Sequence, residues 1–263
     1  MKRRDFIQNT LAVSLGATAL LDTHAPAADH PTSAREIYEL RVYSLKVAKK
    51  PLLDDYLSKA FIPALRRLQI GRVGVFSEAP NGEEVAVYVL IVFASAEQCV
   101  TLPAHLAADA EHQKAGADYL AATAADPVYE RIQSSLHLAL EGMPTLASPD
   151  PSKSRLLNLR IYESHNERAA AKKIEMFNLH EMPLFRRVGL TPVFFGQTLV
   201  GSNLPNLTYM LVFPDDEARK ATWKSFGADD EWKKLKTMPE YADKEIVSKI
   251  TNKILTPESY SEI

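Results

Sequence analysis

A short strand-like segment occurs twice in this chain and constrains its fold more than any other feature. Leu40-Arg41-Val42-Tyr43 returns as Leu159-Arg160-Ile161-Tyr162. Successive side chains of an extended strand point to opposite faces, so each copy has one apolar face and one face that carries an arginine and a tyrosine. We therefore expect one structural unit that is used twice.

Other landmarks repeat at a similar spacing. Pro63 and Pro183 each lie inside a predicted helix and are 120 residues apart, and a proline at such a position predicts a kink. Pro127 and Pro239 each begin a Pro-x-Tyr motif and are 112 residues apart. The smaller distance predicts about eight additional residues in the first copy, before its closing strand.

Hydrophobic periodicity predicts the same element order in both copies: strand, helix, strand, strand, helix, strand. A segment that contains three prolines and small polar residues separates the copies and is typical of a linker. We predict an α+β fold in which repeat 1 covers residues 37–141, the linker covers 142–154 and repeat 2 covers 155–263.

The N-terminal segment, residues 1–27, has the features of a signal peptide. A basic stretch, Lys2-Arg3-Arg4, precedes an apolar run from residue 11 to 21 and a cleavage-like Ala25-Pro26-Ala27. The order Arg3-Arg4-Asp5-Phe6-Ile7 resembles the twin-arginine export signal. An ordinary secretory signal and a retained anchor are the alternatives. We expect a periplasmic or secreted protein exported by the twin-arginine route.

The charge and cysteine content exclude several classes of partner. The formal net charge is -2, so the chain lacks the basic excess typical of nucleic-acid binding or of attraction to anionic membranes. We expect no nucleic-acid partner, and no membrane association once the signal is removed. The single cysteine, Cys99, excludes an intramolecular disulfide and a cysteine-rich metal site.

Four segments resemble two tandem NIPSNAP domains. They read YELRVYSL, IPALRRLQIGRVGVF, MPLFRRVGLTPVFFG and LTYMLVFPDDEARKATWKSFGADDEWKKL, and the most specific part runs from Tyr209 to Trp232. The resemblance implies a dimeric α/β barrel, in which two ferredoxin-like units place their sheets face to face about a pseudo-twofold axis. One chain supplies both units here, so a monomer or a higher oligomer is expected. Relatives by fold include cofactor-free monooxygenases, haem enzymes and proteins with no known reaction.

The arginine and tyrosine face of the repeated strand is the first candidate site. If that face points to the cleft between the repeats, Arg41, Tyr43, Arg160 and Tyr162 line it together. Guanidinium groups bind carboxylate or phosphate in a fork geometry, so a small anionic ligand is one hypothesis. The other is structural: the arginines pair with neighbouring acids and hold the two repeats together.

Four other side chains are candidates for chemistry. His137, on the predicted last strand of repeat 1, is expected to reach the cleft as a ligand contact, an acid or a base, or else to be a hydrogen-bonded structural histidine. His105, Asp109 and His112 have the i, i+4, i+7 spacing of metal ligands on a helix, but a solvated helix face has the same spacing. We expect no metal and no cofactor.

Motifs for catalysis are weak in this sequence. It contains no glycine-rich phosphate loop, no Gly-x-Ser-x-Gly and no His-Glu-x-x-His. Trp223, Phe226 and Trp232 recur at helical spacing, which indicates core packing. A non-catalytic small-molecule binding or interaction module is therefore the preferred interpretation. The alternative is a small-molecule enzyme of the monooxygenase or haem type, with His137 or His105 facing the cleft.

Overall fold

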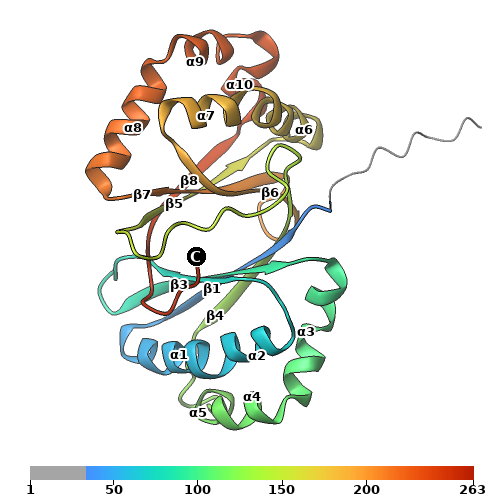
Figure 1. Ribbon diagram of the computed structural model, residues 1–263, viewed down its shortest axis with the longest axis vertical. Helices are drawn as coiled ribbons and strands as arrows, with labels where there is room; N and C mark the ends of the chain where they lie inside the picture. The colour runs from blue at the N-terminus through green and yellow to red at the C-terminus, as the bar shows by residue number, and fades with distance from the viewer. Residues whose placement is uncertain (1–33) are drawn as a thin grey trace, which may run out of the picture. The chain divides into compact units, whose positions relative to one another are not determined.

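Eight antiparallel strands form a closed barrel in the computed structural model, which describes residues 34–263 (Figure 1). The order around the barrel is β1-β3-β2-β8-β5-β7-β6-β4, so each repeat contributes four neighbouring strands. The strands are β1 (Ile37–Lys46), β2 (Val73–Ser77), β3 (Glu84–Phe93) and β4 (Arg131–Ala139) in repeat 1, and β5 (Leu156–Glu163), β6 (Thr191–Val200), β7 (Asn206–Phe213) and β8 (Lys249–Pro257) in repeat 2.

The helices of each repeat cover the outer face of that repeat's own strands (Figure 1). Repeat 1 has α1 (Lys50–Tyr56), α2 (Ile62–Arg67), α3 (Ala96–Ala108), α4 (Ala110–Ala115) and α5 (Ala117–Leu120). Repeat 2 has α6 (Glu167–Met176), α7 (Met182–Val188), α8 (Asp216–Ala228), α9 (Asp230–Leu235) and α10 (Asp243–Ile246). Short 3₁₀ segments are η1 (Val47–Lys49) and η4 (Pro239–Tyr241). The predicted fold, two ferredoxin-like repeats in one dimeric α/β barrel, is confirmed.

The seam between β2 and β8 is short and is extended by the segment that follows β8. Only two residue pairs join these strands in the ladder. Beyond them, the Glu258 N–H donates to the Val75 carbonyl at 2.9 Å and the Glu262 N–H donates to the Val73 carbonyl at 3.0 Å. The Ser261 hydroxyl accepts a bond from the Val75 N–H at 2.9 Å. These bonds satisfy backbone groups of β2 that would otherwise lie at an open sheet edge.

The strand registers decide which face of the repeated strand points inward. Leu40 of β1 and Leu159 of β5 belong to one apolar cluster inside the barrel. Tyr43 belongs instead to the cluster between β1 and the helices of repeat 1. The guanidinium carbon of Arg41 lies 5.3 Å from the ring centroid of Phe61, which is in the helical layer.

The predicted orientation of the arginine and tyrosine face is therefore wrong: Arg41, Tyr43, Arg160 and Tyr162 face the helices, and the apolar face lies between the two sheets. The physical reason is that the two sheets pack against each other inside a closed barrel, where apolar side chains are removed from water most completely. The layer between sheet and helices accepts long side chains that stack on aromatic rings.

The predicted irregularity at Pro63 takes the form of a π-helical turn. Two five-residue π segments, η2 (Leu57–Phe61) and η3 (Phe177–Glu181), each end two residues before a proline. In η2 the N–H of Ile62 bonds to the carbonyl of Leu57, five residues earlier. Pro63 has no N–H, and its ring conflicts with the carbonyl four residues earlier in a regular helix. A π turn relieves that conflict, and Pro183 has the same effect in repeat 2.

The predicted eight-residue excess of repeat 1 is wrong. Equivalent positions are 120 residues apart at the start of α4 and α9 and 118 apart at the start of β4 and β8, so repeat 1 has two additional residues. The two Pro-x-Tyr motifs are not equivalent, since the one at Pro127 directly precedes β4 whereas the one at Pro239 forms η4. The second occurrence of this three-residue motif is therefore a coincidence of sequence, and the two motifs do not lie at equivalent positions of the repeats.

One end of the barrel interior is filled by chain segments outside the strands. Leu146 of the linker and Ile263 both lie in the apolar cluster inside the barrel. Arg72 donates to the Leu146 carbonyl at 3.3 Å and to the Ser148 hydroxyl at 2.7 Å, and the Leu146 N–H donates to the Glu36 carboxylate at 2.6 Å. The linker is thus a fixed part of the barrel interior.

The expected signal peptide at residues 1–27 lies outside the described residues and stays a prediction. Within residues 34–263, every helix is too short or too polar to cross a bilayer.

A buried ion pair distinguishes repeat 2 from repeat 1. Lys173 Nζ lies 2.7 Å from Glu181 Oε1, and the two side chains are 1% and 2% exposed. Burial lowers the pKa of Lys173, but the charge and hydrogen bond of Glu181, together with Tyr162 and Asp243, outweigh it and raise that pKa overall. The positions 120 residues earlier hold Leu53 and Phe61, which are buried apolar residues of the helical layer. The same two positions therefore hold an ion pair in repeat 2 and buried apolar side chains in repeat 1.

We predict that Glu181→Ala lowers the free energy of unfolding by about 3–5 kcal/mol, because it leaves the buried Lys173 ammonium with only the largely exposed Asp243 carboxylate, 3.8 Å away. The double variant Lys173→Leu, Glu181→Phe restores the apolar residues of repeat 1, and we expect it to cost less than about 1.5 kcal/mol. Urea denaturation measures both values. A double variant that is less stable than Glu181→Ala would contradict this account of the pair.

Candidate functional site

A cavity of about 350 Å³ opens between the two repeats at the end of the barrel opposite Leu146 and Ile263. Side chains from β1, β3, β4, β5 and β8 form its wall, together with residues next to β2 and in the β6–β7 loop. The lining residues are Leu40, Val42, Ser44, Glu78, Ala86, Tyr88, Gln133, Ser134, Ser135, Leu159, Ile161, Glu163, Ser202, Asn203, Thr251 and Lys253.

The deeper wall of the cavity is apolar and comes from the repeated strand. Leu40 and Val42 enter from repeat 1, and Leu159 and Ile161 enter from repeat 2. These four side chains are the inward face whose burial closes the barrel. The repetition that organises the fold therefore also gives the cavity its apolar surface.

Glu78, Tyr88 and Lys253 form a polar group on the cavity wall. The Tyr88 hydroxyl donates a short hydrogen bond to Glu78 Oε1. Lys253 Nζ lies 3.0 Å from Glu78 Oε1 and 3.1 Å from Oε2. Burial, with the hydrogen bond to Glu78, raises the pKa of Tyr88. Tyr88 is therefore a protonated hydrogen-bond donor at neutral pH, and it joins residues of both repeats through Glu78.

The charged groups of the cavity do not favour an anion. Two carboxylates, Glu78 and Glu163, line it with one ammonium, Lys253. Lys249 lies 3.5 Å from Glu163 and is largely exposed. A neutral or cationic group fits this charge distribution better than an anionic group. The hypothesis of an anionic ligand in this cleft depended on Arg41 and Arg160. Both arginines lie in the helical layers and do not line the cavity.

Arg41 lies between β1 and the helices of repeat 1, where a carboxylate of the same strand neutralises it. Its Nε donates to Glu39 Oε1 at 2.7 Å and its Nη2 donates to Oε2 at 2.9 Å. Ser134 on β4 donates to the same carboxylate at 2.7 Å. Tyr43 packs edge-on against Tyr129. The pairing with a neighbouring acid matches the structural hypothesis for Arg41, but the pair lies within repeat 1 and does not join the two repeats.

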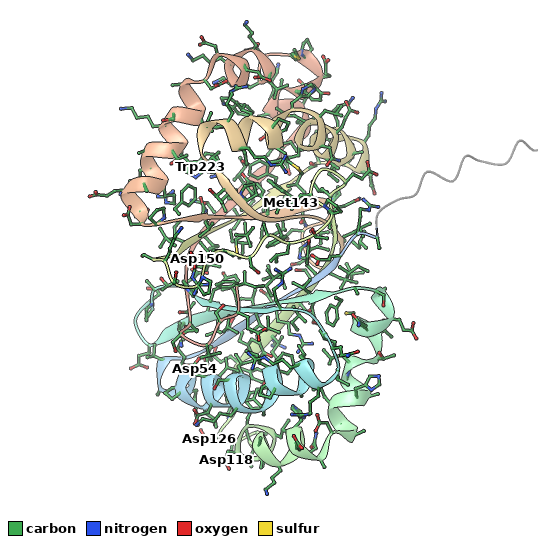
Figure 2. The ribbon with its side chains drawn as sticks, viewed as in Figure 1. Asp54, Asp118, Asp126, Met143, Asp150 and Trp223 are labelled. Atoms are coloured by element: carbon green, nitrogen blue, oxygen red, sulfur yellow. The ribbon has the colours of Figure 1, made fainter. Side chains whose placement is uncertain are left out.

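Arg160 lies in the corresponding layer of repeat 2 but has no carboxylate. Its Nη2 donates to the Tyr162 hydroxyl at 3.1 Å. Its guanidinium carbon lies 4.5 Å from the ring centroid of Trp223, which projects from α8 toward the sheet (Figure 2). Its Nε is buried without a hydrogen-bond partner. Arg41 and Arg160 thus belong to two separate layers, and no shared cleft brings them together.

His137 is buried one hydrogen bond behind the cavity wall. Its Nε2 lies 2.8 Å from the hydroxyl of Ser135, which lines the cavity, and its Nδ1 lies 2.9 Å from the hydroxyl of Thr198 on β6. Burial lowers the pKa of His137 to about 4. The imidazole is therefore neutral at pH 7 and does not itself line the cavity. A Cβ at Gly196 would come within 2.7 Å of the His137 Cβ, so this glycine provides the space for the ring.

Asp109 and His112, which have metal-ligand spacing in the sequence, have structural roles in the helical layer of repeat 1. Asp109 accepts a bond from the His112 N–H as the N-cap of α4 and forms an ion pair with Arg67. His112 is buried, with its Nε2 3.1 Å from the Tyr56 hydroxyl. In the described part of the chain no group of three or more His, Cys, Asp or Glu side chains is arranged to hold a metal ion.

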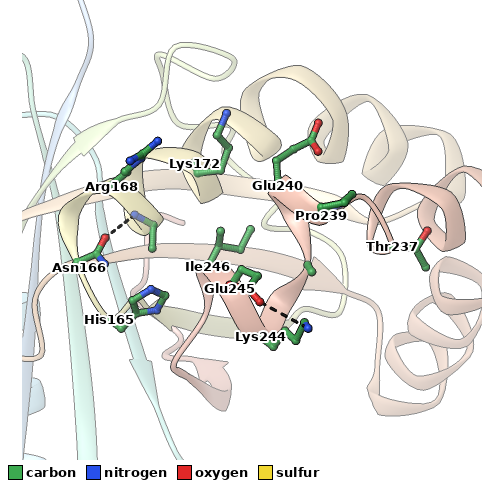
Figure 3. A pocket seen from close by; sticks show the side chains of 12 residues that line it. His165, Asn166, Arg168, Lys172, Thr237, Pro239, Glu240, Lys244, Glu245 and Ile246 are labelled. Carbon is green, nitrogen blue, oxygen red and sulfur yellow. Dashed lines mark hydrogen bonds and ion pairs between the residues drawn. The ribbon is translucent and has the colours of Figure 1, made fainter.

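A larger hollow, of about 700 Å³, lies on the surface of repeat 2 between the start of α6 and α10 (Figure 3). Its side chains carry both charges and are already engaged: Asn166 caps α6 through the Ala169 N–H, and Lys244 lies 3.6 Å from Glu245. Its apolar surface comes from Ile246 and from the smaller side chains of Ala169, Pro239 and Ala242. The smaller cavity between the repeats combines an apolar wall with converging polar groups, so it is the better candidate site.

Sequence reasoning missed Glu78, Tyr88 and Lys253. These residues lie in or next to three different strands, and only the barrel closure brings them together. One signal was available, since Tyr88 has the same parity on its strand as the apolar residues of β3 that face inward. A polar end on an inward-facing aromatic residue requires a partner when buried, which would have indicated a polar group inside the barrel.

Comparisons with known proteins agree with this architecture. Residues 157–262 match the NIPSNAP family model. No curated protein matches the chain.

Three solved structures illustrate the similarity. A putative monooxygenase from Lactobacillus acidophilus is 13% identical, with a TM-score of 0.55 over 85% of this chain and 94% of that chain. A putative monooxygenase from Fusobacterium nucleatum is 9% identical, with a TM-score of 0.55 over 86% of this chain and 93% of that chain. A NIPSNAP-like domain protein from Burkholderia xenovorans is 21% identical, with a TM-score of 0.37 over 41% of this chain and 90% of that chain. At these identities the two monooxygenase structures show a shared fold only.

We predict that His137 makes the protein sensitive to mild acid. Its folded pKa of about 4 is below the ordinary value of 6.5, so the unfolded state binds its proton first. The stability that the neutral ring provides is complete above pH 6.5 and is lost as the pH falls toward 4, by up to about 3 kcal/mol.

Urea denaturation at pH 7 and pH 4.5 tests this expectation in the wild type and in His137→Asn. The wild type should lose about 2–3 kcal/mol more than the variant between the two pH values, because asparagine has no proton to take up in this range. Equal losses would mean that the ring is already protonated or exposed in the folded protein.

Proposed function

Because residues 157–262 are a NIPSNAP domain and the chain has the dimeric α/β-barrel fold, we propose that the protein is a binding module for a small molecule. The site is the cavity between its two repeats. The observation that carries the proposal is the combination of an apolar wall, formed by Leu40, Val42, Leu159 and Ile161, with a few converging polar groups. Sites for small molecules usually have this composition.

The cavity's size and charge narrow the class of ligand. A volume of about 350 Å³ is near the lower end of the roughly 300–1,000 Å³ typical of ligand sites, so a molecule with one or two rings fits. The apolar part of the ligand packs against Leu40 and Ile161. Its polar end, neutral or cationic, meets the Tyr88, Glu78 and Lys253 group.

Binding without catalysis is the function that the lining residues support best. Hydroxyl groups line the cavity at Ser44, Ser135, Ser202 and Thr251, but His137 approaches only Ser135, and burial keeps the pKa of that histidine low. No lining nucleophile therefore has both a base and a group that orients the base.

An enzyme of the monooxygenase type is the second candidate. Two structures with this fold are described as putative monooxygenases, and Tyr88 with Glu78 can pass a proton to or from a molecule in the cavity. Oxygen uptake when the bound molecule is supplied in excess would favour this function. A red-brown colour or bound iron in the purified protein would favour the haem type.

We predict that Ala86→Phe reduces small-molecule occupancy by about tenfold or more. Ala86 lines the cavity, and a phenyl ring at this position occupies the space of the ligand at a cost of about 1–3 kcal/mol to binding. Native mass spectrometry of the purified protein, followed by identification of the molecules released on denaturation, measures the occupancy.

Ala104→Phe is the matched control, because it makes the same chemical change on an exposed position of α3. It should carry the same molecule as the wild type. A wild type that releases no small molecule, or an Ala86→Phe variant that retains it fully, would reject the cavity as the binding site.

A further inference from the structure

The two repeats provide an internal comparison at the arginine of the repeated strand. Arg41 and Arg160 occupy the same position of β1 and β5, facing the helices of their own repeats. Two residues earlier, repeat 1 has Glu39 whereas repeat 2 has Asn158. The difference removes one negative charge from an otherwise equivalent place.

In repeat 1 the arginine fork is filled. Glu39 accepts bonds from Arg41 Nε at 2.7 Å and from Nη2 at 2.9 Å, the two-bond geometry in which guanidinium recognises a carboxylate. Ser134 donates a further bond to Glu39 at 2.7 Å. This site shows what a carboxylate bound to the repeated-strand arginine looks like in this protein.

In repeat 2 no carboxylate of the described residues accepts hydrogen bonds from the equivalent arginine, Arg160. Asn158 cannot take the place of the carboxylate, because its oxygen accepts from Trp223 Nε1 at 3.1 Å and its amide donates to Asn252 at 2.6 Å. Arg160 donates through Nη2 to Tyr162, and its buried Nε has no acceptor. A buried donor without a partner is costly, so this nitrogen favours an added acceptor.

The carboxylates nearest to this layer of repeat 2 contact Lys173 and not Arg160. Lys173 and Glu181 neutralise each other at 2.7 Å, and Asp243, 3.8 Å from Lys173, is more than half exposed. Arg160 therefore keeps its full charge beside two aromatic rings. Arg41, in contrast, is neutralised by Glu39.

Solvent reaches this place at the edge of the helical layer. Arg160 and Trp223 are only partly buried, and Asn252, opposite Arg160 on β8, is exposed. A small anion from solution can therefore approach the partly exposed side chain of Arg160, and a shift of side chains at this edge opens the way to its buried Nε. The Trp223 and Tyr162 rings flank the guanidinium and hold it in one orientation.

We infer that Arg160 binds a small carboxylate, either free or as the end of a larger metabolite, in the place that the Glu39 carboxylate takes beside Arg41. The carboxylate accepts from Nε and Nη2, and the exposed Asn252 amide is placed to contact it. This site lies between β5 and α8, outside the barrel cavity, so the inference does not depend on the proposed function.

The fluorescence of Trp223 reports directly on this site. The chain has two tryptophans, and Trp232→Phe leaves Trp223, whose ring centroid lies 4.5 Å from the guanidinium carbon of Arg160, as the single tryptophan. Sodium acetate is titrated into this variant, with sodium chloride exchanged to hold the ionic strength constant. We expect a saturable change in Trp223 emission with acetate and formate and none with chloride alone.

Three further substitutions in the same background test the assignment. Arg160→Met removes the guanidinium, and Asn158→Glu supplies an internal carboxylate like Glu39; each should raise the acetate concentration at the midpoint at least tenfold. Lys220→Met removes one positive charge from an exposed position of α8 and should leave the midpoint within twofold.

Two results would overturn the inference. One is an equal response to acetate and chloride in the parent variant. The other is an acetate midpoint that moves as much in Lys220→Met as in Arg160→Met. Such a result would mean that acetate responds to the net charge of the protein and not to hydrogen bonds from the Arg160 guanidinium. If Asn158→Glu does not fold, Arg160→Met decides the matter by itself, because methionine keeps the apolar stem of arginine.

Discussion

The mutual burial of two sheet faces is the constraint on which the rest of this structure depends. Each four-stranded sheet has one face covered by its own helices, and the remaining face must be removed from water by another layer. Closing the eight strands into a barrel places Leu40 and Leu159 in one apolar interior. The pleat then sends Arg41 and Arg160 to the helical layers. The orientation of every polar side chain in both sites follows from this choice of inward face.

The same constraint explains why the cavity has an apolar wall and a polar group near its opening. Leu146 and Ile263 fill one end of the interior, and the cavity opens toward the other end. Glu78 and Lys253 lie there, where their charged groups keep partial access to water. Their contact joins a residue next to β2 to one on β8, across the seam between the repeats.

The two repeats share the same arrangement of strands, helices and surface ion pairs, but they differ in the side chains that fill the layer between sheet and helices. Arg67 pairs with Asp109, the N-cap of α4, and Arg187 pairs with Asp229, the N-cap of α9, at positions 120 residues later. Between sheet and helices, Leu53 and Phe61 of repeat 1 are replaced by the Lys173–Glu181 ion pair in repeat 2. The Glu39 carboxylate beside Arg41 is replaced by the Asn158 amide. These changes leave the arginine of the second helical layer without the carboxylate contact that the first layer has.

The sequence predicted the fold well because repetition and strand alternation are local signals. The repeated strand, the proline in each helix and the resemblance to NIPSNAP domains all indicated two ferredoxin-like units in one barrel. The candidate site was predicted less well. Alternation shows that a strand has two faces, but it does not show which face points inward. The Glu78, Tyr88 and Lys253 group depends on strands that meet only when the barrel closes, so no local pattern reveals it.

We propose that closure of the two repeats leaves a binding site for a small molecule between them. A high-resolution crystal structure of the protein as purified tests it most directly. The account predicts density for an organic molecule in the cavity, with its apolar part against Leu40 and Ile161 and a polar group next to Glu78 and Lys253. A cavity that holds only ordered water, or that is filled by its own side chains, would contradict it.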